Sequence, residues 1–227
     1  MSLFILIPCK GLERGKSRLS DVLDPASRRA LCESFLRRTL AVAISFVPAN
    51  QVCIITSDDE VAAIASGHAA RIIKDDERGL NQALDLARNT LVSVTNAAHS
   101  TLILPADLPL ATPAALSEMT TATEDVVIVP DEEDDGTNLL LLGPRALGAF
   151  SFAYGQGSFE KHWMQARRHR LRFRILRHPA LCFDVDRSDQ YARWVGVEDI
   201  RLSSLKKWPN RPALVCSPGA GIPGRPR

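Results

Sequence analysis

The chain of 227 residues lacks the features that mark a membrane protein or a disulfide-stabilised protein. No apolar run is long enough to span a bilayer, and no cationic segment precedes the apolar residues 2–7, which argues against a signal peptide. The five cysteines are scattered, odd in number and never spaced as C-x-x-C. That pattern argues against a disulfide framework and against a thiolate zinc site, and it favours a protein of the reducing cytoplasm.

A strong charge bias and the motifs of a covalent hydrolase are also absent. The formal net charge is only +2, so the composition indicates no nucleic-acid partner. The sequence has no G-x-S-x-G elbow and no Ser/His/Asp order that would supply a protein nucleophile. The hydrophobic fraction is 45%, which is enough for a sizeable globular core.

Predicted strands and helices alternate between residues 3 and 130. Apolar runs predict buried strands at 3–7, 52–56, 71–74, 101–104 and 126–129. Asp24-Pro25 and Thr112-Pro113 predict the starts of two of the intervening helices. This alternation predicts an α/β fold with a doubly wound, mostly parallel sheet and right-handed crossovers. No Gly/Ser linker divides the chain, so we expect one domain over 1–202, followed by a flexible, basic, Pro/Gly-rich tail over 203–227.

An acidic residue follows the strand predicted at 101–104. The run stops at Pro105, and Asp107 comes just after it. In open α/β sheets, ligands bind at the carboxyl ends of the strands, so Asp107 is placed to hold a divalent cation over a phosphate. The alternative is that Asp107 only caps a turn before the next helix.

Two further acids occur in the segment Phe183-Asp184-Val185-Asp186. In extended backbone, residues two apart point the same way, so Asp184 and Asp186 are predicted to project together. Like charges held close are costly unless a cation neutralises them. The pattern therefore predicts a divalent-metal site made with Asp107, and the alternative is an Asp-rich turn that caps the following helix.

A basic, glycine-containing loop follows the first strand. Residues 10–19 contain two glycines and four cations, a composition typical of a loop that cradles phosphate. Gly15-Lys16-Ser17 matches the end of a Walker A motif, but that motif needs a glycine at the position of Lys10, so we reject it. The alternative is a solvated basic loop.

Three other places offer groups that suit a ligand. Thr137 and Asn138 begin a strand, where a hydroxyl and an amide can hold a ligand oxygen. Ser158 ends the turn Gly155-Gln156-Gly157-Ser158 and is predicted as the N-cap of a helix whose amino end favours a phosphate or carboxylate. Asn81, near the start of an amphipathic helix, is placed to contact a base or ribose. The alternative for Ser158 is a helix cap without a ligand, and the alternative for Asn81 is an exposed residue on the helix surface.

The run from Arg167 to Arg177 alternates cations with apolar residues and is predicted to be an amphipathic strand with a basic face. Nucleic-acid binding by this strip stays open, although the strip lacks surface aromatics for base stacking. The five histidines are spread along the chain, and we expect no histidine ligand.

Acids at the sheet edge, a basic glycine loop and a doubly wound sheet together point to nucleotidyl transfer. In such chemistry, positioning and charge neutralisation replace a covalent nucleophile. Mg²⁺ prefers oxygen ligands and commonly takes one to three carboxylates together with phosphate oxygens.

An ordered set of short blocks across residues 3–200 resembles the 2-phospho-L-lactate guanylyltransferase family. The blocks are Lys16-Ser17-Arg18-Leu19, Gly79-Leu80-Asn81-Gln82-Ala83-Leu84, Leu104-Pro105-Ala106-Asp107-Leu108-Pro109, Asp131 through Gly136-Thr137-Asn138, Gly155-Gln156-Gly157-Ser158-Phe159 and Phe183-Asp184-Val185-Asp186.

The resemblance implies a nucleotide-diphosphosugar-transferase-like fold, a Rossmann-like architecture of three layers. It implies an enzyme that joins GMP from GTP to 2-phospholactate, phosphoenolpyruvate or 3-phosphoglycerate, releases pyrophosphate and serves coenzyme F-420 biosynthesis. By motif match, Asp107, Asp184 and Asp186 are expected to bind Mg²⁺, and Asp107 is also a catalytic residue on the GTP side.

The resemblance further assigns the two substrates to different residues. Lys16 is expected to act as a catalytic residue on the GTP phosphates, with Asn81 also on the GTP side. Thr137, Gly155 and Ser158 are expected to hold the small acid. No nucleic-acid or membrane partner is expected, and a homodimer is left open. Two alternatives stand beside this assignment: a nucleotidyltransferase of the same fold acting on a sugar phosphate or molybdopterin-type acceptor, and an RNA-binding protein that uses the 167–177 strip.

Overall fold

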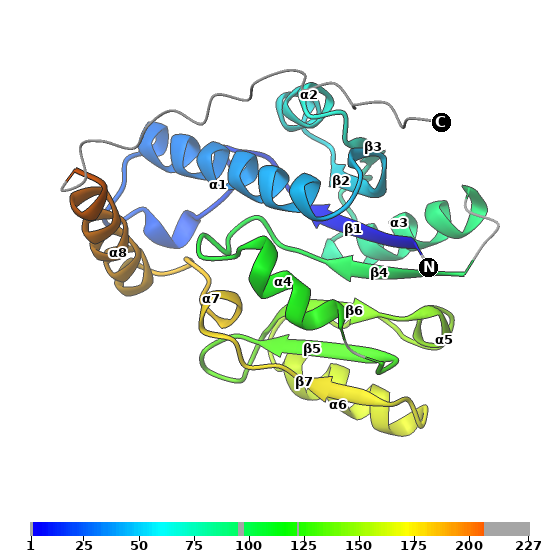
Figure 1. Cartoon of the computed structure of the whole chain (residues 1–227). Helices are drawn as coiled ribbons and strands as arrows, with labels where there is room; N and C mark the ends of the chain where they lie inside the picture. Colours follow the sequence, from blue (N-terminus) through cyan, green and yellow to red (C-terminus); the bar gives the residue numbers. More distant parts are fainter. Residues whose placement is uncertain (1, 95–97, 122, 207–227) are drawn as a thin grey trace, which may run out of the picture.

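A computed structural model describes residues 2–94, 98–121 and 123–206 of the chain. Within these residues, seven strands form one sheet in the order β3-β2-β1-β4-β6-β5-β7 (Figure 1). The strands are β1 (Ser2–Pro8), β2 (Val52–Thr56), β3 (Arg71–Lys74), β4 (His99–Ile103), β5 (Val126–Pro130), β6 (Thr137–Leu142) and β7 (Phe173–Ile175).

Helices connect the strands and cover the sheet. They are α1 (Pro25–Phe46), α2 (Asp59–Gly67), α3 (Leu80–Val94), α4 (Pro113–Thr120), α5 (Pro144–Leu147), α6 (Ser158–Arg168), α7 (Pro179–Cys182) and α8 (Ser188–Lys206), with short 3-10 helices η1 (Ser17–Leu19) and η2 (Ala49–Gln51). The predicted caps of α1 and α4 are confirmed. The Asp24 side chain accepts hydrogen bonds from Ala26 N and Ser27 N, and the Thr112 side chain accepts one from Ala115 N.

One strand of the sheet is reversed. Strands β1 to β4 pair in parallel, as do β5 and β7, whereas β6 lies antiparallel between β4 and β5. The predicted mostly parallel α/β sheet is therefore confirmed. Because β6 runs against its neighbours, its first residue, Thr137, lies at the edge where the parallel strands end.

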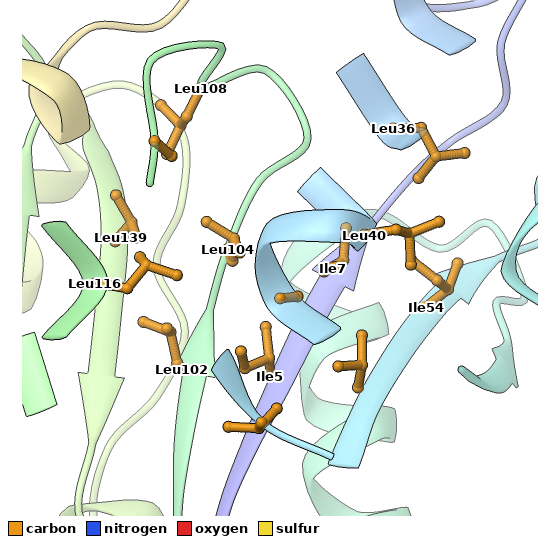
Figure 2. Packing of buried hydrophobic residues seen from close by; sticks show 14 of the residues in the cluster. Ile5, Ile7, Leu36, Leu40, Ile54, Leu102, Leu104, Leu108, Leu116 and Leu139 are labelled. Atoms are coloured by element: carbon orange, nitrogen blue, oxygen red, sulfur yellow. The ribbon is translucent and has the colours of Figure 1, made fainter. Parts of the chain in front are cut away.

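Two apolar layers enclose the sheet, because successive side chains of a strand point to opposite faces. In β1, Ile5 and Ile7 face the cluster made with α1, α2, α4 and α7, whereas Phe4 and Leu6 face the cluster made with α3, α5 and α6. Figure 2 shows Leu36 and Leu40 of α1 packed over the strands on the first of these faces. Leu40 is fully buried, so truncating it to alanine is expected to cost about 2–5 kcal/mol of stability.

A third cluster anchors the loops that form the candidate site. Leu19 of η1, Phe35 of α1, and Phe183 and Val185 of the segment before α8 are buried together, with Trp194 of α8 packed against them. This packing fixes both the basic loop and the 183–186 segment beside the carboxyl ends of the strands.

The predicted strand over 167–177 is wrong. Arg167 and Arg168 are the last residues of α6, and Arg170 follows in a left-handed conformation with φ of 52°. Only Phe173–Ile175 pair as a strand. The apolar residues of α6 keep their helical spacing, so the helix extends into the basic run. Beyond the helix, Arg172 contacts the buried carboxylate of Asp125. The run is therefore no continuous basic strip.

The expected domain boundary at 202 stays a prediction. Helix α8 continues to Lys206, and most of the expected tail lies outside the described residues. Across the described ranges, none of the helices has the length and apolar character needed to cross a bilayer.

Candidate active site at the carboxyl edge of the sheet

Asp107 lies just beyond the end of β4. Leu104 N still donates to Leu6 O at 2.9 Å, and the chain then leaves the sheet at Pro105. The hydroxyl of Thr39 in α1 donates to Ala106 O at 3.2 Å and so holds this turn from the helix side. The carboxylate of Asp107 is thereby fixed at the sheet edge, with its side chain 32% exposed.

The segment that carries Asp184 and Asp186 runs alongside this turn. Val185 N donates to Asp107 O at 3.1 Å, which brings the two flanking acids next to Asp107. One carboxylate oxygen from each of Asp107, Asp184 and Asp186 lies within 4.8 Å of the others. The three acids converge as the sequence predicted, and their binding of a metal stays a prediction.

Lys16 joins this cluster from the basic loop. Its Nζ donates to Asp107 Oδ2 and to Asp186 Oδ1, both at 2.8 Å, and its side chain is only 8% exposed. Burial alone would lower the pKa of Lys16, but the two carboxylates hold it above its usual value, so the ammonium stays charged. Its backbone φ of 55° is left-handed, a conformation that costs a non-glycine residue about 1–2 kcal/mol and often marks a functional position.

The cluster carries a surplus of negative charge that suits a cation. Burial, together with the neighbouring charges of Asp107 and Asp186, raises the pKa of Asp184 to about 6. Three oxygen donors within 4.8 Å of one another match the hard, oxygen-only ligand preference of Mg²⁺. The residues present therefore fit a bound magnesium ion.

Asn138 has a different role from the one predicted. Its amide nitrogen donates to Leu181 O at 3.0 Å and to Cys182 O at 2.9 Å, and the residue is buried. The amide therefore satisfies the free carbonyls at the end of α7. It supports the segment that leads into Asp184, and its amide nitrogen is not free for a ligand oxygen.

Ser158, Gly155 and Thr137 form a second group on the same edge. The N-cap of α6 is Gly157, and Ser158 is the first helical residue, so the predicted cap is displaced by one position. The reason is that Ser158 Oγ is already engaged, accepting Thr137 N at 2.8 Å. Ser158 N in turn donates to Gly155 O at 3.0 Å, and the φ of Gly155, 118°, is one that few residues other than glycine adopt.

His162 is a site residue that the sequence interpretation missed. Its Nδ1 lies 2.9 Å from Thr137 Oγ1, its Nε2 accepts Ala153 N at 3.0 Å, and the residue is fully buried. Burial, with a smaller effect of the Lys161 charge, lowers the pKa of His162 to about 4. The available signal was spacing: residues four apart, such as Ser158 and His162, share one face of a helix.

Asn81 binds the backbone of Tyr154 through both ends of its amide. Its Nδ2 donates to Tyr154 O at 3.1 Å, and its Oδ1 accepts Tyr154 N at 2.8 Å. The side chain therefore fixes the strand-like segment before Gly155 to α3. The expected contact with the nucleotide stays a prediction.

A cavity of about 360 Å³ opens where β1, β2 and β3 end. Both cationic and anionic side chains line it, together with a hydroxyl and a glycine: Lys10, Arg14, Ser57, Asp75, Glu77 and Gly79. Arg14 Nη1 and Ser57 Oγ both donate to Glu77 Oε1, at 3.0 and 2.7 Å. The cavity thus offers charged and hydrogen-bonding groups at the strands that precede β4 in the sheet order, whereas Thr137 begins β6, which follows β4.

The fold is similar to those of solved nucleotidyltransferases. A nucleotidyl transferase from Methanothermobacter has a TM-score of 0.62 at 16% identity, covering 89% of this chain and 99% of that protein. A crystal structure from Desulfovibrio desulfuricans G20, described as that of a candidate nucleotide-diphospho-sugar transferase, has a TM-score of 0.59 at 15% identity. The match covers 78% of this chain and 80% of that protein. These likenesses confirm the expected nucleotide-diphosphosugar-transferase-like fold.

Sequence relatives narrow the assignment. The phosphoenolpyruvate guanylyltransferase of Rubrobacter xylanophilus is 38% identical over 196 residues, covering 85% of this chain and 93% of the relative. That of Roseiflexus sp. is 35% identical over 192 residues, covering 83% of each. The family described as "Guanylyl transferase CofC like" matches residues 3–194. The chain therefore belongs to the CofC-like guanylyl transferase family.

Proposed function

We propose that this protein joins GMP from GTP to a phosphorylated three-carbon acid and releases pyrophosphate. The observation that carries the proposal is the meeting of Asp107, Asp184 and Asp186 with Lys16 at the sheet edge, in a chain of this family. Phosphoenolpyruvate is the first choice of acid because the relatives are named for it. 2-Phospholactate and 3-phosphoglycerate are the other two candidates. The proposal includes the cytoplasm as compartment and coenzyme F-420 biosynthesis as the destination of the product.

The guanosine is assigned to the 360 Å³ cavity at the ends of β1, β2 and β3. Guanine presents N–H donors along one edge, and the carboxylates of Asp75 and Glu77 are acceptors of matching chemistry. Lys10 and Arg14, which also line the cavity, supply positive charge that suits the first phosphate of the nucleotide. The triphosphate then extends along the basic loop toward Lys16.

Magnesium is assigned to Asp107, Asp184 and Asp186, which fit it by donor type and spacing. When bound, the ion supplies charge neutralisation for the triphosphate. Lys16, held between Asp107 and Asp186, provides the adjacent fixed positive charge. As the leaving pyrophosphate gains charge in the transition state, a positioned ammonium at this point stabilises it.

The acid is assigned to Thr137, Gly155 and Ser158, on the opposite side of the carboxylates from the cavity. An oxygen of the acid's phosphate attacks the α-phosphorus of GTP in line, and the bond from that phosphorus to the β-phosphate's bridging oxygen breaks. No protein atom forms a covalent bond, so the chain's contribution is to orient two anions and to offset their repulsion.

The test is a substrate panel. Purified protein with Mg²⁺ is given GTP, ATP, CTP or UTP together with each of the three acids, a hexose 1-phosphate or molybdopterin. Pyrophosphate release is followed, and the product is identified by mass spectrometry. We expect a GMP adduct of one acid with GTP. Turnover only with a sugar phosphate or molybdopterin, or salt-sensitive RNA binding without nucleotide turnover, would overturn the proposal.

A further inference from the structure

The imidazole of His162 lies between a backbone amide and the hydroxyl of Thr137. Nε2 accepts a hydrogen bond from Ala153 N at 3.0 Å, and Nδ1 lies 2.9 Å from Thr137 Oγ1. The rings of Tyr154 and Phe150 pack on the imidazole, with centroids 5.0 and 5.6 Å away. The ring is therefore held on several sides and has no exposed surface.

These contacts define where the imidazole carries its hydrogen. A backbone N–H is a donor only, so Nε2 must be the unprotonated nitrogen of the ring. The ring is neutral, because burial lowers the pKa of His162 to about 4. The single ring hydrogen is therefore on Nδ1, and Nδ1 donates it to Thr137 Oγ1.

The orientation of the Thr137 hydroxyl follows from this assignment. Oγ1 accepts from His162, so its own hydrogen must point away from the ring. Among the described residues, this hydroxyl makes no second hydrogen bond, and Thr137 keeps 7% of its surface exposed. The hydroxyl hydrogen is therefore available for donation away from the ring, which suits an anionic oxygen.

We propose that His162 is a positioning residue that fixes the Thr137 hydroxyl as a donor to an anionic oxygen of the phosphorylated acid. The inference rests on the proposed function, since it deepens the role of the acid-binding group. Thr137 N also donates to Ser158 Oγ, and Ser158 N to Gly155 O, so hydrogen bonds connect Thr137 to the other two residues of the group. A buried, uncharged residue then sets the direction in which the Thr137 hydroxyl donates to the acid.

Two substitutions separate the two contacts of the ring. In His162→Asn the side-chain amide stands near the place of Nδ1 and still donates to Thr137. In His162→Gln the amide reaches the place of Nε2 and preserves the contact with Ala153 instead. We expect the KM for the acid to rise about 10- to 100-fold in His162→Gln and to stay within about 3-fold of wild type in His162→Asn, since a hydrogen bond to a charged group is worth about 1.5–3 kcal/mol.

The readouts must separate positioning from loss of folding. The dissociation constant for GTP and the midpoint of thermal unfolding are measured for each variant, and we expect GTP binding to be unchanged in both. Thr137→Val provides the cycle: because His162 acts through that hydroxyl, adding His162→Gln to Thr137→Val is expected to raise KM no further.

Each outcome decides a separate claim. An active wild type whose KM for the acid is the same in His162→Gln overturns the inference and leaves the proposed function standing. Equal increases in KM for His162→Asn and His162→Gln also overturn it, as do fully additive effects with Thr137→Val. A wild type that turns over none of the acids with GTP overturns the proposed function and the inference together.

Discussion

The carboxylate cluster and the group of Thr137, Ser158 and His162 lie at the same edge of the sheet, yet they are built in opposite ways. Asp107, Asp184, Asp186 and Lys16 all carry ionisable side chains, and the acids are partly open to solvent. Thr137, Ser158 and His162 are uncharged and almost fully buried. The first arrangement is held together by contacts between charged groups and is accessible to solvent ions. The second depends on fixed hydrogen-bond directions.

Under the proposed function, each group suits the substrate assigned to it. A triphosphate with its ion brings large charges that change during the reaction, so charged groups near water suit it. A small acid differs from its competitors by one hydroxyl or one double bond, so a rigid and dry surface is the better discriminator. We call Asp107, Asp184, Asp186 and Lys16 the charged side, and Thr137, Ser158 and His162 the neutral side. Substitutions on the charged side should therefore alter kcat, and substitutions on the neutral side should alter the KM for the acid.

Asp107→Asn should give the largest effect. It removes one charge from the cluster without changing its size, and we expect kcat to fall about 10³-fold while the KM for the acid changes little. Steady-state kinetics with pyrophosphate detection measures both. Asp59→Asn, an exposed residue in the first turn of α2, is the matched control. A rate equal to wild type would remove Asp107 from the catalytic group.

On the neutral side, the buried imidazole of His162 should make the free energy of unfolding depend on pH. The folded pKa of His162 is about 4, below the ordinary value of 6.5, so the unfolded chain takes up a proton first as pH falls. Stability is then unaffected by this residue above about pH 6.5 and is lost progressively between pH 6.5 and pH 4, by on the order of 3 kcal/mol in total.

Urea unfolding of wild type and His162→Asn at several pH values isolates this contribution, because all other titrating groups are shared. We expect the stability of the wild type to fall more steeply than that of the variant. Parallel curves would mean that the pKa of His162 is the same in the folded and the unfolded chain, which would contradict the effect of burial on the ring.

Lys16→Met tests whether the charged side works as a unit. Removing the ammonium takes away the cation that is hydrogen-bonded to both Asp107 and Asp186, and we expect kcat to fall about 10²-fold. The variant should also be stabilised more by Mg²⁺ than the wild type, because the carboxylates have lost the positive charge of Lys16 and keep only the longer contact of Arg18 with Asp186. Thermal melts with and without Mg²⁺ check this, with the exposed Lys74→Met as control. An equal Mg²⁺-induced shift of the unfolding midpoint in the wild type and in Lys16→Met would show that Lys16 does not neutralise the cluster.

Asn138→Ala should give the smallest effect and tests the link between the two sides. Asn138 follows Thr137 directly, but its amide holds the end of α7, which leads to Asp184. Loss of two buried hydrogen bonds is expected to cost about 2 kcal/mol of stability, measured by urea unfolding. Asn89→Ala on the exposed surface of α3 is the control. A cost no larger than that of the control would mean that α7 is held by other contacts.

Much of the sheet and of the charged side was predictable, because both depend on local pattern. The fully buried strand β2 is a continuous apolar run, as expected where helices cover both faces of a sheet. Asp184 and Asp186 were grouped by the two-residue period of extended backbone. The strand over 167–177 failed for the same reason, since alternation alone did not show that α6 runs on to Arg168.

The neutral side was only half predictable. Turn chemistry pointed to Gly155 and Ser158, but the partners of His162 are Thr137 and Ala153, which come from separate segments that meet only in the folded chain. Asn138 was misassigned on the same ground: the carbonyls that it holds lie more than 40 positions away along the chain. Such hydrogen bonds leave no periodic trace in sequence.

The reversed strand β6 places a loop, instead of a helical crossover, next to Thr137. Because β5 and β6 form a hairpin, the stretch that joins them, residues 131–136, projects at the carboxyl edge and delivers Thr137 there. A hairpin tip tolerates insertions and replacements that a βαβ crossover does not. A change in the length or sequence of these six residues can therefore alter the surroundings of Thr137 while the pairing of the strands stays the same.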